Sequence, residues 1–328
     1  MNRTARTMTL PGNAGYSSVM ASEKIVLYEN LRACSYTPFY LAQLTGLFEA
    51  EGLEVDLRLS PSPPETARGL IEGRADVSFG GPMRVAMHHD AAHARGETSP
   101  LVCFAQVVAR DPFILVGREP NPQFRFGDLV GPRVGVATDV PTPWMTLYDD
   151  LDRAGIDPAA LTRAPDASMA ENAEALKRGE IDVVQLFEPH AEGLVSGGHG
   201  HVWHRFSVRG DIAFTTFYTT RRFAAGRRSA CMALTRAIAA ALALIHETAP
   251  AETAAIVGPA FFPDLPPEGF ARIVAHYREA GIWPRTTALP AAAYARLKAA
   301  LLAGGLIAYD VPYDDAVDAA LSEPGAAP

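Results

Sequence analysis

The chain has 328 residues, of which 48% are hydrophobic and 20% charged, the composition of a soluble globular protein with room for about two domains. The net charge is −8, and the sequence has no basic stripe that could neutralise phosphates, so nucleic acid is not an expected partner. Its three cysteines, Cys34, Cys103 and Cys231, lack the spacing of a zinc site and are predicted to be small core residues.

Residues 1–22 form a polar tail that carries Arg3 and Arg6 but no apolar run of the length that secretory signals have. No segment reaches the roughly 18 apolar residues that span a bilayer. The richest stretch, 237–245, is predicted to lie in an amphipathic helix.

The first part of the chain alternates between strand and helix. The predicted strands are 24–28, 53–59 and 75–79, and the predicted helices are 38–51 and 65–72. Pro38 is suited to the first turn of its helix, and Gly52 and Gly73 end the two helices. This order predicts parallel strands with crossover helices.

A second α/β unit follows, and the chain ends in helices. The predicted strands are 101–109, 113–117, 133–137, 181–187 and a returning strand at 214–219; the predicted helices are 144–154, 169–178, 227–247, 251–258, 267–280 and 290–303.

Two motifs stand out in combination. The first runs from Ser35 to Gln43 (SYTPFYLAQ) and continues as Gly-Leu-Phe at 46–48 and Glu-Gly-Leu-Glu-Val at 51–55. The second is Leu-Ile-Glu-Gly-Arg-Ala-Asp-Val at 70–77. Together they resemble the substrate-binding proteins of ABC importers for sulfonates, nitrate, taurine and thiamine pyrimidine precursors. That group also includes a fungal enzyme of thiamine pyrimidine synthesis, and the resemblance covers roughly residues 24–303.

The resemblance implies an α/β fold of the type II periplasmic-binding-protein class. It has two lobes, each with a mainly parallel sheet flanked by helices, and a two-strand hinge. Lobe 1 is expected at 23–110 and 218–320, and lobe 2 at 111–217. The hinge crossings are expected near 108–113 and 214–220. The implied protein is a periplasmic, monomeric solute receptor that delivers one small organic molecule to ABC permease subunits, although residues 1–22 show no export signal.

In open α/β sheets, ligands bind beyond the carboxyl ends of the parallel strands. After the first strand come Asn30 and the loop that holds Tyr36 and Thr37. After the third strand comes the turn Gly81, Pro82, Met83 and Arg84, where Arg84 either pairs with an anion or points to solvent.

Further candidates come from the middle of the chain. Pro141, Thr142 and Trp144 precede or open a helix, and Trp144 is either a stacking wall or ordinary core. Glu188 follows a strand and matches the acidic residue that contacts the heterocycle in pyrimidine-binding relatives; alternatively it caps a turn. Asp111 either bridges the lobes or caps a turn. Stacking faces are expected from Tyr36, Phe39, Trp144, Phe187 and Phe217.

Catalytic motifs are missing from the sequence. It contains no G-x-S-x-G elbow, P-loop or G-x-G-x-x-G after a strand, and its histidines, such as His88, His89 and His93, do not form H-E-x-x-H. We therefore expect no cofactor, no metal and no enzymatic activity. The expected ligand is aromatic or heteroaromatic, such as a thiamine pyrimidine precursor, and a sulfonate is less favoured. The alternative is a cytoplasmic pyrimidine synthase or ligand sensor on the same fold.

Overall fold

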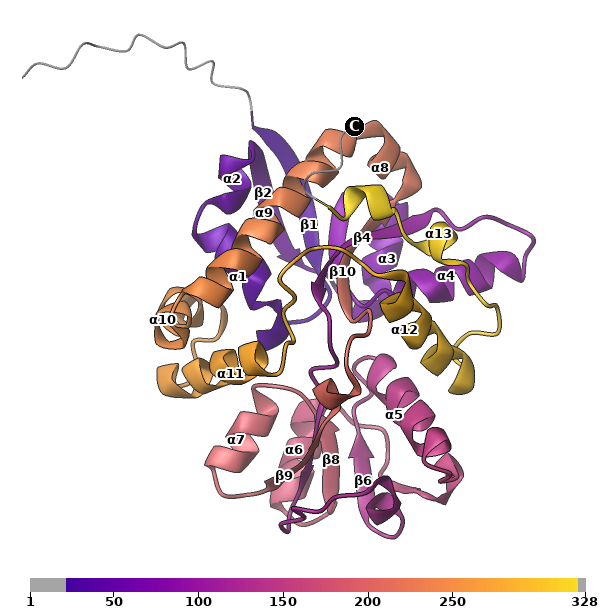
Figure 1. Cartoon of the computed structure of the whole chain (residues 1–328), viewed down its shortest axis with the longest axis vertical. Helices are drawn as coiled ribbons and strands as arrows, with labels where there is room; N and C mark the ends of the chain where they lie inside the picture. The colour runs from indigo at the N-terminus through magenta and orange to yellow at the C-terminus, as the bar shows by residue number, and fades with distance from the viewer. Residues whose placement is uncertain (1–21, 324–328) are drawn as a thin grey trace, which may run out of the picture.

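The computed structural model describes residues 22–323, which form two lobes joined by two crossing segments (Figure 1). Each lobe is built on a five-stranded sheet. The predicted tail at residues 1–22 therefore lies almost entirely outside the described residues. The α/β class and the two-lobed architecture are confirmed.

The first sheet has the strand order β2-β1-β3-β10-β4. Its strands are β1 (Glu23–Glu29), β2 (Leu53–Leu59), β3 (Val77–Gly80), β4 (Leu101–Val108) and β10 (Thr215–Thr220). β1 pairs in parallel with both β2 and β3, and β10 is antiparallel to β3 and β4.

The second sheet has the order β7-β6-β8-β5-β9. Its strands are β5 (Ile114–Gly117), β6 (Arg133–Val136), β7 (Thr162–Arg163), β8 (Val183–Leu186) and β9 (His201–Arg205). β6 is parallel to β7 and β8, and β5 is antiparallel to β8 and β9.

Each sheet has one reversed strand, and both reversals have the same cause. The chain leaves the first sheet at the carboxyl end of β4, crosses, and enters the second sheet from the facing edge as β5. It leaves at the carboxyl end of β9 and returns in the same way as β10. Both sheets consequently present the carboxyl ends of their parallel strands to the gap between the lobes.

The helices cover both sheets. The first lobe has α1 (Thr37–Leu44), α2 (Leu47–Ala50), α3 (Pro63–Ile71), α4 (Met83–His93), α8 (Arg221–Gly226), α9 (Arg228–Glu247), α10 (Pro250–Phe261), α11 (Pro267–Glu279), α12 (Ala291–Ala303) and α13 (Tyr313–Ala316). The second has α5 (Thr142–Arg153), α6 (Met169–Lys177) and α7 (His190–Ser196). Short 3-10 turns lie at Cys34–Tyr36 (η1), Phe126–Leu129 (η2), Pro158–Ala160 (η3), Phe206–Arg209 (η4) and Ala319–Leu321 (η5).

Two expectations about local structure are wrong. The predicted single helix over 38–51 is broken into α1 and α2, because Gly46 takes a left-handed conformation (φ 73°) that interrupts the helix. The second crossing lies between β9 and β10, at residues 206–214, so the predicted segment 214–220 is almost entirely strand β10. The lobe limits at 110/111 and 217/218 remain a proposal, and β10 already belongs to the first sheet from Thr215.

The core of the first lobe is aromatic near the gap. Phe39 of α1 stacks on Phe79 of β3 with ring centroids 3.8 Å apart, and Phe217 of β10 contacts Phe39 edge-on at 5.3 Å. The long apolar helix α9 is the one described helix with the length and composition of a membrane span. Much of it is buried, and it packs against α1 and α2, as a core helix of a globular lobe does.

Candidate functional site

A cavity of about 30 Å³ lies where the two sheets face each other. Its walls come from the loop after β1, the start of α4, the two crossing segments and the ends of β6 and β8. The residues that line it are Asn30, Leu31, Ala33, Ser35, Tyr36, Gly81, Met83, Pro112, Phe113, Val140, Thr142, Phe187, Phe214 and Thr215. The set joins both lobes and both crossings, so a molecule held here touches every part that moves in a hinge motion.

The lining is apolar with a few hydroxyl and amide groups. Its apolar walls include the rings of Phe113, Phe187 and Phe214, and its polar groups belong to Asn30, Ser35, Tyr36, Thr142 and Thr215. No lining residue carries a charged side chain. Apolar walls with a small number of placed polar groups are the usual composition of a small-molecule pocket.

Asn30 and Tyr36 form the polar centre of this wall. The Tyr36 hydroxyl donates to Asn30 Oδ1 over 2.9 Å. Gly80 leaves space for this amide, because a β-carbon there would lie 3.3 Å from Asn30 Nδ2. Burial, and secondarily the nearby Glu29 carboxylate, raises the pKa of the Tyr36 phenol, so the phenol keeps its proton and acts as a neutral donor.

Five residues predicted from the sequence line the cavity: Asn30, Tyr36, Gly81, Met83 and Thr142. Phe187, predicted as a stacking face, lines it as well. Pro112, Phe113, Phe214 and Thr215 also line the cavity and were not predicted as site residues, although they fall within the segments where the hinge crossings were expected. Ser35 could have been found, because it belongs to the same loop as Tyr36.

Four other predicted residues, Thr37, Pro82, Arg84 and Pro141, do not line the cavity. The Thr37 hydroxyl donates to the Cys34 carbonyl over 2.7 Å, and Pro82 and Pro141 are the residues that precede α4 and α5. Arg84 is 8% exposed, so it points neither to solvent nor into the cavity; its Nε has no hydrogen-bond partner within residues 22–323.

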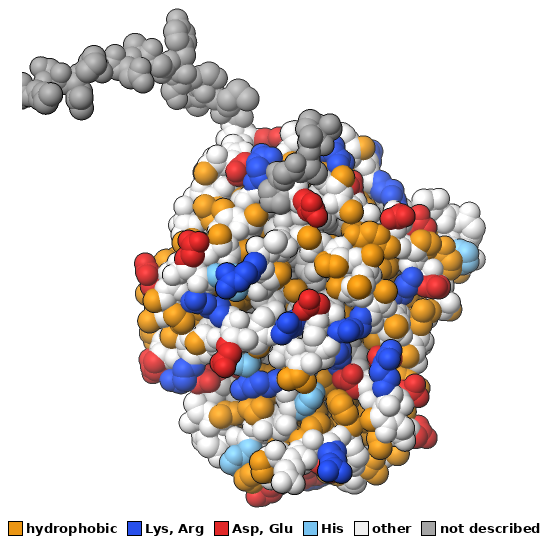
Figure 2. Space-filling model, in the orientation of Figure 1, with side chains coloured by type: hydrophobic (Ala, Val, Ile, Leu, Met, Phe, Trp, Pro, Cys, Tyr) orange, Lys and Arg blue, Asp and Glu red, His pale blue; other side chains and the backbone are white. Residues whose placement is uncertain are grey.

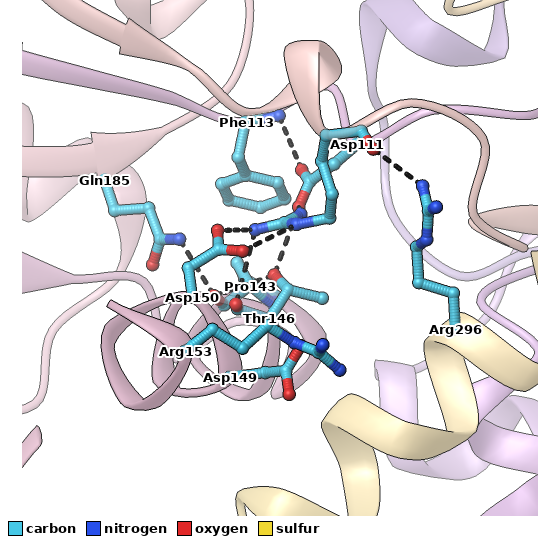
Figure 3. Close-up of polar contacts among 10 residues, drawn as sticks. Asp111, Phe113, Pro143, Thr146, Asp149, Asp150, Arg153, Gln185 and Arg296 are labelled. Atoms are coloured by element: carbon cyan, nitrogen blue, oxygen red, sulfur yellow. Dashed lines mark hydrogen bonds and ion pairs between the residues drawn. The ribbon is translucent and has the colours of Figure 1, made fainter. Parts of the chain in front are cut away.

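Asp111 belongs to the first crossing and is fully buried. It accepts hydrogen bonds from the Phe113 backbone N–H (2.9 Å), from Thr146 Oγ1 (3.1 Å) and from Arg209 Nη1 (2.6 Å). Arg209 lies in η4 on the second crossing and also pairs with Asp150 of α5. In Figure 3, Asp111, Thr146 and Asp150 converge from the hinge and α5. Asp111 thus joins the two crossings directly behind Pro112 and Phe113 of the cavity.

Trp144 and Phe217 lie away from the cavity. The Arg163 guanidinium lies 4.3 Å from the ring centroid of Trp144, and Tyr148 contacts this ring edge-on at 6.1 Å. Phe217 is fully buried among Phe39 and Phe104 in the first-lobe core.

Glu188 lies at the contact between the lobes, next to the lining residue Phe187. It is 4% exposed, its carboxylate accepts the Glu192 backbone N–H over 2.7 Å, and its own backbone N–H donates to the Tyr277 hydroxyl of α11 over 3.4 Å. Burial raises the pKa of Glu188 to about 7, against the opposing effects of the Glu192 hydrogen bond and the Arg205 charge. The binding role predicted for Glu188 and the other site residues remains a proposal.

Two first-lobe helices, α11 and α12, reach the second lobe on opposite sides of the two crossing segments (Figure 1). On one side, Arg272 of α11 donates to Glu192 of α7 over 2.6 Å, and Arg205 of β9 donates to His276 Nε2 of α11 over 2.7 Å. On the other side α12 packs on α5, and Arg296 of α12 donates to the Arg209 carbonyl over 2.6 Å. These contacts describe a closed arrangement of the lobes.

Residues 22–323 contain no group of three or more His, Cys, Asp or Glu side chains placed to hold a metal ion. On the face drawn in Figure 2, Lys and Arg side chains are interspersed with Asp and Glu and do not gather into one basic stripe.

Comparison with known proteins gives both sequence and structural matches. The sequence profile of the NMT1-like family matches residues 31–258. The YtlA protein of Bacillus subtilis (strain 168), described as a binding protein without a named ligand, is 27% identical over 217 residues, which is 66% of this chain and 64% of that protein. The 4-amino-5-hydroxymethyl-2-methylpyrimidine phosphate synthase of Schizosaccharomyces pombe is 33% identical over 165 residues, which is 50% of this chain and 44% of the enzyme.

Both alignments span less than two thirds of the curated relatives. Among solved structures, the alkanesulfonate-binding protein SsuA from Xanthomonas axonopodis pv. citri, bound to MOPS, superposes with a TM-score of 0.70 at 18% identity. The match covers 90% of this chain and 98% of that one, and it shows a shared fold.

Proposed function

The chain belongs to the NMT1-like family, and from this premise we propose that it is a solute-binding protein that closes two lobes around one small organic molecule. The observation that carries the proposal is the cavity itself, which takes its lining from both lobes and both crossings. The relative YtlA, described as a binding protein, supports the same role.

Entry of the ligand requires the lobes to separate. A cavity of about 30 Å³ holds a water molecule or two, whereas ligand pockets for small organic molecules have roughly 300–1,000 Å³. The crossing segments supply the hinge, and opening breaks the Arg272–Glu192 contact between α11 and α7 and the packing of α12 on α5.

The lining favours an aromatic or heteroaromatic ligand over a sulfonate. Phe113, Phe187 and Phe214 offer apolar surface for a flat ring, and the hydroxyl and amide groups offer hydrogen bonds at its edge. Without a charged partner in the lining, an anionic ligand loses its hydration with little return. A thiamine pyrimidine precursor fits these requirements, and the similarity to the pyrimidine phosphate synthase points the same way.

An enzyme of the pyrimidine synthase kind is the second candidate, favoured by the 33% identity to the S. pombe synthase. The lining favours a binding protein over an enzyme, because it contains no His, Cys, Lys, Asp or Glu that could serve as a general base or nucleophile at the cavity.

The first test is mass spectrometry of the small molecules released when freshly purified protein is denatured. We expect a single heteroaromatic compound in stoichiometric amount, and re-addition of that compound at 100 times its Kd stabilises the fold by about 2.7 kcal/mol. Catalytic conversion of that compound into a released product would overturn the binding role in favour of the enzyme.

We further propose that the protein acts in the periplasm as a monomer and delivers its ligand to the membrane subunits of an ABC permease. The support is the shared fold with periplasmic binding proteins such as SsuA of Escherichia coli. Fractionation of the source cells tests the location: recovery of the native protein solely from the cytoplasm contradicts it and favours an intracellular enzyme or sensor.

A further inference from the structure

The polar side of the cavity contains a hydrogen bond between two of its lining residues, Tyr36 and Asn30. Tyr36 has a single hydroxyl proton, and it goes to Asn30 Oδ1 over 2.9 Å. Because burial raises the pKa of this phenol, the proton stays on the phenol oxygen, and in this geometry it is donated to the amide oxygen of Asn30. The side-chain carbonyl oxygen of Asn30 is therefore already hydrogen-bonded to Tyr36 before a ligand binds.

The other half of the Asn30 amide is unpaired. Asn30 is 4% exposed and lines the cavity, and its Nδ2 has no hydrogen-bond partner among residues 22–323. An amide NH₂ carries two donors and no acceptor, so a ligand meets N–H groups at this point. Nδ2 is not fully enclosed by protein atoms, and a ligand with a lone pair at this point can accept a hydrogen bond from it.

Gly80 leaves room for the amide. A β-carbon at this position would lie 3.3 Å from both Cγ and Nδ2 of Asn30, so the glycine lets the amide lie close to the end of β3. The remaining polar groups of the wall, in Ser35, Thr142 and Thr215, are hydroxyls that donate or accept as needed. Asn30 is thus the lining side chain whose hydrogen-bonding sense is set before the ligand arrives.

We propose that Asn30 determines specificity by donating from Nδ2 to the ligand, and that Tyr36 is the positioning residue that holds the amide in this orientation. The ligand class is then an uncharged, flat molecule with an acceptor ring nitrogen or carbonyl oxygen at its edge. This inference rests on the binding role proposed above and narrows it.

Two substitutions separate the two roles. Asn30→Asp keeps an oxygen for Tyr36 but replaces the free donor with an acceptor. Tyr36→Phe keeps the amide and removes the hydroxyl that orients it. Tyr148→Phe is the matched control, since Tyr148 lies on α5 beside Trp144 and does not line the cavity.

The experiment is isothermal titration calorimetry at pH 8 with 4-aminopyrimidine, nicotinamide, benzoate and methanesulfonate as probes. The wild-type protein is expected to bind the two neutral probes at least about tenfold more tightly than the two anions. Asn30→Asp weakens the binding of the neutral probes about tenfold or more, and Tyr36→Phe weakens it about fivefold, the sizes expected for an unpaired group and for one lost hydrogen bond. Tyr148→Phe changes it less than about twofold.

The failures are distinguishable. If the wild-type protein binds no probe and releases no small molecule on denaturation, the binding role itself fails. If a neutral probe binds the wild-type, Asn30→Asp and Tyr36→Phe proteins equally well, the binding role stands and the assignment of Asn30 and Tyr36 is wrong. Tighter binding of benzoate or methanesulfonate than of the neutral probes also overturns the assigned ligand class. Circular dichroism of each variant checks the fold, and Tyr36→Phe provides the test alone if Asn30→Asp does not fold.

Discussion

Arg209 and Asp111 join the two hinge segments through a nearly buried ion pair, with Arg209 Nη1 2.6 Å from Asp111 Oδ2. Asp111 lies on the segment that leaves the first lobe, and Arg209 lies on the segment that returns to it. The same two segments are joined a second time by Arg110 and Asp211 at 3.0 Å, in a pair that is open to solvent. One buried and one solvent-exposed ion pair therefore join the same two hinge segments.

We predict that the two links differ sharply in their contribution to stability. Asp111→Ala leaves the Arg209 charge without one of its carboxylates in a buried position and is expected to cost about 3–5 kcal/mol of unfolding free energy. Asp211→Ala removes a carboxylate whose side chain is 67% exposed and is expected to cost less than about 1 kcal/mol. Urea unfolding of both variants measures the difference. Equal losses of unfolding free energy would show that the buried ion pair of Asp111 does not stabilise the hinge more than the exposed pair does.

We predict a stability difference at Glu188 that grows with pH. Burial raises its pKa to about 7 from an ordinary value of 4.5, so the folded chain holds a proton that the unfolded chain has lost between these values. The stability from this group is fully present below pH 4.5 and falls as the pH rises through 7. Glu188→Gln, which keeps an acceptor for the Glu192 N–H, should match the wild type near pH 5 and exceed it by on the order of 2–3 kcal/mol at pH 8.

Unfolding curves at pH 5, 6, 7 and 8 check this prediction. Parallel profiles for the wild-type and Glu188→Gln proteins would mean that Glu188 is ionised in the folded chain, with Arg205 compensating its charge. The same variant also tests the predicted ligand contact of Glu188, because a direct contact with the ligand would change affinity as well as stability.

His276 is expected to have the opposite pH dependence. Burial, followed by the charge of Arg205, lowers its pKa to about 4, and its Nε2 accepts a hydrogen bond from Arg205. The folded chain then holds fewer protons than the unfolded chain between pH 6.5 and 4, so stability is present above 6.5 and lost as the pH falls. His276→Gln should reduce the loss between pH 7 and pH 5 by about 1–2 kcal/mol, after allowance for partial exposure.

Thermal or urea unfolding at pH 7 and pH 5 measures this loss. His201→Gln is the control, because His201 lies exposed on β9. An equal effect of the two substitutions would contradict a specific role for the contact of His276 with Arg205 across the lobes.

Gly80→Ala is predicted to impair binding more than folding. Its β-carbon would lie 3.3 Å from both Cγ and Nδ2 of Asn30, which must shift by a few tenths of an ångström to make room. We expect a loss of stability of about 1–2 kcal/mol together with a several-fold weaker binding of the tightest neutral probe. Gly226→Ala in α8, where a β-carbon would meet no atom within 4 Å, should leave both quantities nearly unchanged. Unaltered affinity in Gly80→Ala would indicate that the Asn30 amide tolerates displacement.

The fold followed from local patterns because each pattern depends on neighbouring residues. Strand–helix alternation, the prolines that open helices and the glycines that end them all act within a few residues. They predicted most of the elements, but not β7, β9, α7, α8 and α13. The exception at Gly46 is instructive: the apolar pattern of 38–51 continues through it, and only the backbone conformation reveals the break.

The candidate site could be predicted only in part. Asn30, Tyr36, Gly81, Met83 and Thr142 were found because they follow strands, and the carboxyl ends of parallel strands meet at one edge. Asp111, Trp144 and Phe217 satisfy similar sequence criteria. The structure places Asp111 in the hinge network, Trp144 half-buried beneath Arg163 on α5, and Phe217 in the core. Sequence position says which edge of a sheet a residue approaches, but not on which side of the wall its side chain lies.

The sequence by itself determined the class of fold, the two α/β units and the loops that approach the gap, since these depend on periodicity and on turn residues. Only the tertiary structure decided where the second crossing runs, which residues form the cavity and which polar groups there are already paired. Those properties arise from contacts between residues far apart in the chain, such as Arg209 with Asp111, and from the orientation of individual side chains, which no local pattern specifies.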